Sequence, residues 1–137
     1  MGVRTSVQKS SMTAIDELPP SSGDLVWVDL GPTKGREQNG VRPAVVLTDS
    51  AFHLRNATAI ICPITSNTHP WPTKVILPAG LPVAGAVLAD QIRSVDRSTH
   101  GFRRVGAVPA SVLAEIRLKV AVPIGAVADG DLPGPTP

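Results

Sequence analysis

The sequence predicts one small, mostly β domain, a barrel of short strands closed by a single C-terminal helix. Short apolar runs alternate with turns along a chain that holds 14 prolines and 12 glycines in 137 residues, a pattern typical of small barrels. Only the segment after Pro109 has apolar residues at helical spacing, which are Val112, Leu113, Ile116 and Val120.

Composition agrees with a single domain and an aliphatic core. Apolar residues make up 42% of the chain and aromatic residues only 3%, so Val, Ile, Leu and Ala must fill the interior. The net charge is +2, and residues 23–125 hold 11 basic against 7 acidic side chains, which suits an anionic partner. The one cysteine, Cys62, excludes an internal disulfide, and we expect it to be a buried apolar residue.

The two ends of the chain differ from its middle. Residues 1–22 are polar and rich in Ser, which predicts a flexible lead, and either Met1 or Met12 could be the start. Residues 126–137 predict a disordered tail, so the folded domain should span residues 23–125. No apolar run approaches the roughly 20 residues of a membrane span, and no secretion signal is present, so we expect a cytoplasmic protein without a membrane partner.

The first predicted strand, residues 23–30, has apolar side chains at both odd and even positions and so on both faces. The polar connection 31–40 is longer than a usual hairpin loop of about 2–5 residues, which indicates a functional or a mobile segment. The next strand, 43–47, is apolar throughout, which predicts burial on both faces. Arg42 stands at its entrance, and Pro43 restricts the backbone there.

Shorter elements follow. Residues 49–56 predict a helical turn and residues 57–64 a second apolar strand, while strand 73–77 lies between prolines and should be at an edge. The remaining predicted elements are a turn at 80–84, one bent strand over 85–88 and 90–95, a last strand over 103–108, and the helix between Pro109 and Pro123.

Several kinds of active site are absent from the sequence. It has no glycine-rich phosphate loop, no histidine pair at metal spacing and no Gly-x-Ser-x-Gly motif. The three histidines, His53, His69 and His100, fall in polar segments, where we expect solvated side chains. We therefore predict a protein without metal or cofactor.

Polar residues gather instead at the predicted strand ends. Each has an ordinary explanation: Arg42 suits a protein surface, Thr65 can close a strand, and Asp90 can cap a turn. Glu37 can pair with a neighbouring base in solvent for little energy. The whole set consists of Glu37, Gln38, Arg42, Thr65, Ser66, Asp90 and Gln91.

Taken together, these motifs resemble the MazF/PemK family of type II toxins, the mRNA interferases. The resemblance rests on residues 23–30, on Pro32-Thr33-Lys34-Gly35 with Glu37-Gln38, and on residues 42–47, 62–66 and 87–94, in that order. It implies an SH3-like small barrel of the MazF/PemK/CcdB type, a homodimer and a cognate antitoxin that blocks the RNA groove. It also implies a metal-independent, sequence-specific endoribonuclease acting on single-stranded RNA.

The resemblance also implies roles for individual residues. The family's catalytic arginine and threonine fall on Arg42 and Thr65, and Glu37 and Gln38 match the loop that gates the site. Some PemK members carry an arginine where this chain has Leu88, and residues 31–41 lack the histidine that some members use. Catalysis would thus rest on fewer groups. Glu37 is the expected general base only because its residue type suits that role.

The expected reaction is attack of the RNA 2′-OH on the adjacent phosphorus, which leaves a 2′,3′-cyclic phosphate and a 5′-OH end. Arg42 would neutralise the phosphoryl oxygens, and Thr65 would donate a hydrogen bond to one of them. Trp71 is the expected stacking platform or else a buried rim residue, and Trp27 should serve the core or a dimer contact. The residues expected to bind substrate are Lys34, Arg36, Gln38, Ser66, Trp71, Lys74, Asp90, Gln91 and Arg93.

Two other functions are compatible with such a barrel. One is a CcdB-like gyrase poison that cuts nothing, and the other is an inactive homologue that only binds antitoxin or RNA. Fold alone does not decide between them. The pairs Arg42-Pro43 and Thr65-Ser66 resemble the ribonuclease branch and favour the enzyme.

Overall fold

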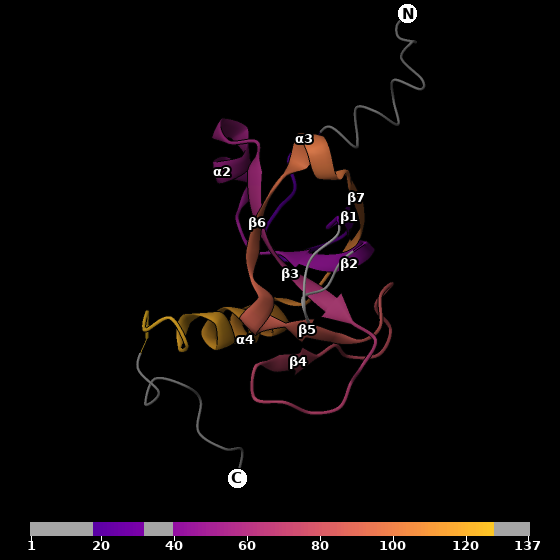
Figure 1. Cartoon of the computed structure of the whole chain (residues 1–137), viewed down its shortest axis with the longest axis vertical. Helices are drawn as coiled ribbons and strands as arrows, with labels where there is room; N and C mark the ends of the chain where they lie inside the picture. The colour runs from indigo at the N-terminus through magenta and orange to yellow at the C-terminus, as the bar shows by residue number, and fades with distance from the viewer. Residues whose placement is uncertain (1–17, 32–39, 128–137) are drawn as a thin grey trace, which may run out of the picture.

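The computed structural model describes residues 18–31 and 40–127. In these ranges seven strands form one antiparallel sheet in the order β4-β5-β3-β2-β1-β7, with β6 paired to β3. Figure 1 shows the sheet curling round, with α4 at one end and α2 and α3 at the other. The bounds are β1 Asp24–Asp29, β2 Val41–Val46, α2 Ser50–Arg55, β3 Thr58–Thr65, β4 Lys74–Ile76, β5 Ala86–Leu88, the 3-10 helix η1 Ala89–Gln91, β6 Arg93–Asp96, α3 Arg97–His100, β7 Phe102–Ala107 and α4 Ala110–Ala121.

The sheet is buried on both faces, as the sequence predicted for β1 and β2. Successive side chains of a strand point to opposite faces, so β1 places Leu25 in one apolar cluster and Val26 and Val28 in another. The first cluster includes Ile116 of α4. Cys62 belongs to it too, and burial, aided by the charge of Asp90, raises the pKa of its thiol to about 12. The prediction of a buried, apolar cysteine is confirmed.

Strand β3 is the centre of the sheet. One of its edges pairs with β2, while the other is shared, with β6 along residues 58–61 and β5 along residues 64–65. The helix η1 separates β5 from β6, so the bent strand predicted over 85–95 is two strands with a turn of helix at the bend. Strand β4 lies at an edge, as its flanking prolines predicted.

His53 corrects the prediction of a solvated loop histidine. Its side chain is 4% exposed and lies on α2, whose N-cap residue Asp49 accepts a hydrogen bond from the backbone of Phe52. Nδ1 of His53 lies 2.7 Å from the carbonyl oxygen of Pro20 and donates to it, because a carbonyl only accepts. In the neutral ring Nε2 then accepts from the hydroxyl of Thr48, 2.6 Å away.

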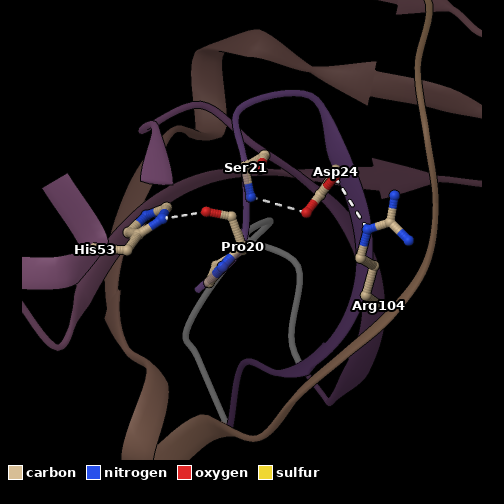
Figure 2. Close-up of polar contacts among 5 residues, drawn as sticks. All are labelled: Pro20, Ser21, Asp24, His53 and Arg104. Carbon is tan, nitrogen blue, oxygen red and sulfur yellow. Dashed lines mark hydrogen bonds and ion pairs between the residues drawn. The ribbon is translucent and has the colours of Figure 1, made fainter. Parts of the chain in front are cut away.

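The same contacts fix the end of the N-terminal lead, which we expected to be flexible up to residue 22 (Figure 2). Pro20 is buried, and the carboxylate of Asp24 accepts a hydrogen bond of 2.8 Å from the backbone of Ser21. Asp24 also pairs with Nε of Arg104 on β7 at 3.1 Å. The packed part of the chain thus begins before residue 23.

Helix α4 begins after Pro109 and packs against the sheet through Ile116 and Val120. Two of its basic side chains reach the sheet backbone, since Arg117 donates to the carbonyl of Leu47 and Lys119 to that of Lys74, each at 2.9 Å. No helix in the described part of the chain is long and apolar enough to cross a membrane.

We predict that Ile116→Ala lowers the free energy of unfolding by about 2–5 kcal/mol, because it leaves a cavity where side chains are fully buried. Ile124 is 70% exposed just beyond α4, so Ile124→Ala is the matched control and should change stability by less than about 0.5 kcal/mol. Urea unfolding of both variants measures the difference. Equal losses would contradict the packing of α4 described above.

Candidate active site

A groove of about 290 Å³ lies where β2 begins and β3 ends. These strands pair with Ala44 opposite Pro63, and Arg42 and Thr65 each lie two residues beyond this pair, where both line the groove. The two residues that the sequence marked as catalytic therefore line the same groove from adjacent strands. The groove is lined by Trp27, Arg42, Pro43, Ile64, Thr65, Ser66, Pro82, Val83 and Ala84.

Both faces of the sheet contribute to this groove. By the alternation of side chains, Arg42 and Thr65 belong to one face, while Pro43 and Ile64 belong to the other. All four border the groove because it crosses the strand ends, where the two faces meet. A bound molecule can thus contact polar side chains and apolar ones together.

Arg42 is half-buried and positively charged at any physiological pH. Among residues 18–31 and 40–127, neither a hydrogen bond nor an ion pair engages its guanidinium, so its donors can meet an anion in the groove. A guanidinium presents its N–H groups as a flat fork that fits phosphate oxygens. Since Arg42 is the second residue of β2, its backbone is held in place by the sheet.

Thr65 is the polar partner of Arg42. Its side chain is 8% exposed, and Oγ1 accepts a hydrogen bond of 3.1 Å from the backbone nitrogen of Asn67. This bond uses one lone pair of the hydroxyl and leaves its proton to be donated. The contact orients the hydroxyl, and Ser66 adds a second, exposed hydroxyl to the same groove.

The wall formed by residues 82–84 depends on a glycine that the sequence analysis did not single out. Gly85 has φ +134°, and a Cβ there would lie 2.3 Å from the carbonyl oxygen of Thr65. No side chain fits, so only glycine lets this segment approach Thr65 so closely. The available signal was a glycine at the edge of an apolar strand, which often marks a close backbone approach.

The loop that follows β3 carries two further predicted site residues. Lys74 donates to the carbonyls of Asn67 and His69 at 2.9 and 3.0 Å, so its ammonium group binds this loop, and Lys74 does not line the groove. Trp71 is 61% exposed and does not line the groove, so the alternative of a buried rim residue is wrong. Trp27 lines the groove instead.

The other predicted residues lie elsewhere. Asp90 is exposed on η1 and Gln91 follows it, while Arg93 on β6 reaches the carbonyl of Leu30 at 3.5 Å. None of the three lines the groove. The loop residues Lys34, Arg36, Glu37 and Gln38 fall outside the described residues, so their roles stay predictions.

Comparisons with known proteins agree with this fold. The family model described as PemK-like, MazF-like toxin of type II toxin-antitoxin system matches residues 21–123. The endoribonuclease toxin MazF of Escherichia coli K12 is 39% identical over 106 residues, which cover 77% of this chain and 95% of that protein.

Solved structures give the same result. The crystal structure of MazF from Deinococcus radiodurans is 41% identical, with a TM-score of 0.74 over 78% of this chain and 97% of that one. A MazE–MazF crystal structure from the same organism is 40% identical, with a TM-score of 0.70 over 77% of this chain and 96% of that one. The predicted mostly β fold with a C-terminal helix is confirmed.

We predict that Gly85→Ala destabilises the protein more than Gly80→Ala does, by at least about 1 kcal/mol. Both glycines have positive φ, where alanine costs about 1–2 kcal/mol, but a Cβ at Gly80 meets nothing within 4 Å. The added overpacking against Thr65 falls on Gly85 alone. Chemical denaturation of the two variants gives the comparison, and equal stability would contradict the close approach.

Proposed function

Because the chain belongs to the PemK-like, MazF-like toxins of type II toxin-antitoxin systems, we propose that it is a sequence-specific endoribonuclease that cleaves single-stranded mRNA without a metal ion. The observation that carries this proposal is the shared groove of Arg42 and Thr65. It pairs a permanent positive charge with an oriented hydroxyl at one place. Such a pair suits a phosphodiester whose oxygens gain negative charge as a bond breaks.

In the proposed mechanism the ribose 2′-OH loses its proton and attacks the adjacent phosphorus. The bond from phosphorus to the 5′ oxygen then breaks, which leaves a 2′,3′-cyclic phosphate on one fragment and, after proton uptake, a 5′-OH on the other. Arg42 binds the non-bridging oxygens through its fork, and Thr65 donates a hydrogen bond to one of them. Arginine does not give up its proton, so it is not the base, and Glu37 is proposed for that role.

We further propose that a cognate antitoxin inhibits the protein. A relative that is 40% identical to this chain has been solved as a MazE–MazF structure, and the proposal extends such a pairing to this chain. An antitoxin segment that fills the groove would cover Arg42 and Thr65 together. The active form is proposed to be a homodimer that meets its RNA and its antitoxin in the cytoplasm.

The experiment that tests this function is incubation of the purified protein with mixed RNA in EDTA, followed by mapping of the new 5′ ends. We expect cuts at defined sequences, ends that carry 5′-OH, and 2′,3′-cyclic phosphate on the opposite fragments. A requirement for added divalent metal, or 5′-phosphate ends, would contradict the mechanism. Intact RNA would contradict the function itself.

We predict that Arg42→Ala lowers the cleavage rate at least about a hundredfold, because loss of one transition-state donor costs on the order of 2.7–4 kcal/mol. Arg55 is the control, since it is exposed on α2 and lines no part of the groove. Arg55→Ala should therefore cleave at the original rate. Circular dichroism would verify that both variants are folded, and near-normal cleavage by folded Arg42→Ala would refute the role.

A further inference from the structure

Trp27 is on a strand of the sheet and yet belongs to neither apolar cluster. Its strand neighbours Leu25, Val26 and Val28 are almost completely buried, whereas the indole of Trp27 is only half-buried. Trp27 is among the residues that line the groove with Arg42. The ring is therefore in a position to bind something in the groove as well as to support the sheet.

The pairing of β1 with β7 places the side chain of Arg103 beside Trp27. Trp27 stands opposite Pro43 on β2 and opposite Arg103 on β7. Residues directly opposite each other in antiparallel strands share a face and have Cβ atoms about 4.5–5.5 Å apart. Arg103 therefore flanks Trp27 on the side away from Pro43.

Arg103 differs from its neighbour Arg104 in what it binds. Arg104 points to the other face and pairs with the carboxylate of Asp24 at 3.1 Å. Arg103 is exposed, and within the described ranges no hydrogen bond or ion pair engages its guanidinium. It stands on β7, the last strand in the sheet order, so its charge is open to an approaching anion.

We propose that Trp27 and Arg103 form a nucleotide subsite beside the scissile phosphate, in which the indole stacks on a base and the guanidinium binds a neighbouring backbone phosphate. This inference rests on the proposed function. Proteins bind single-stranded RNA by stacking bases on aromatic rings and by holding phosphates with basic side chains. Trp27 and Arg103 lie on the face of the sheet that carries Pro43, and the groove, which Trp27 lines, joins this face to Arg42 and Thr65 at the strand ends.

The subsite would position RNA without selecting one base. Every base has a face that stacks, so an aromatic platform tolerates any sequence, and a phosphate contact carries no sequence information. Substitution of either residue should therefore lower the cleavage rate at all sites by a similar factor. The recognised sequence itself should not change.

The chain has two tryptophans, Trp27 and Trp71, which allows a paired fluorescence test. Trp71→Phe leaves only the emission of Trp27, and Trp27→Phe leaves only that of Trp71. The probe is an oligonucleotide that contains the mapped cleavage site, with 2′-deoxyribose at the attacking position to block cleavage. We expect it to quench the emission of Trp71→Phe and to leave that of Trp27→Phe unchanged.

Two results would overturn the role of Trp27. Quenching confined to Trp27→Phe would assign stacking to Trp71. Emission of Trp27 that follows protein concentration and ignores the oligonucleotide would assign the indole to a subunit contact. Binding of a labelled oligonucleotide gives an independent readout, in which Trp27→Leu should weaken the affinity about 10-fold or more and Trp27→Phe much less, as expected for loss of one stacked base.

Arg103→Gln tests the phosphate contact, with Arg55→Gln as the matched control on α2. Removal of one phosphate contact should reduce the slope of log affinity against log salt by about 1, while the control leaves the slope unchanged. An unchanged slope in Arg103→Gln would refute the contact. Failure of the proposed function is distinguishable, because the unaltered protein would then cleave no RNA, whereas failure of the subsite leaves its cleavage intact.

Discussion

The pairing of β2 with β3 links the packing of the core to the position of the groove. Strand β3 lies between β2 on one edge and both β5 and β6 on the other, and its residues 61–65 are all buried. Sliding β3 by one residue would exchange its two apolar faces, so the core fixes the register. The same pairing brings Thr65 and Arg42 to one groove. The packing of the interior thus determines the geometry of the groove.

Much of the fold was predictable because apolar residues on both faces of a strand leave a clear pattern. The strands around Val26, Val45 and Ile61 were found in this way, and the helix through Ile116 by its 3.6-residue period. The environment of His53 was not predictable. Helix α2 is six residues long, too short for a period to be recognised, and His53 is buried by contacts with Pro20, which is 33 positions away.

The candidate site was predictable in part. Arg42 and Thr65 were identified by resemblance, and their proximity follows from strand pairing, which sequence patterns alone do not supply. The positions of the tryptophans could not be derived, because exposure depends on which loop covers which strand. Trp27 has an apolar strand pattern around it, which favours the core or a dimer contact, whereas Trp71 follows a proline in a polar loop. The close approach at Gly85 likewise involves residues 20 positions apart in the chain.

In the proposed mechanism the catalytic groups come from two parts of the chain, the paired strands β2 and β3 and the connection between β1 and β2. The charge of Arg42 and the hydroxyl of Thr65 are carried by paired strands, where little reorganisation is needed when the phosphate gains charge. The proposed base, Glu37, comes from the long connection between β1 and β2. The electrostatic half of the proposed site is therefore built into the sheet.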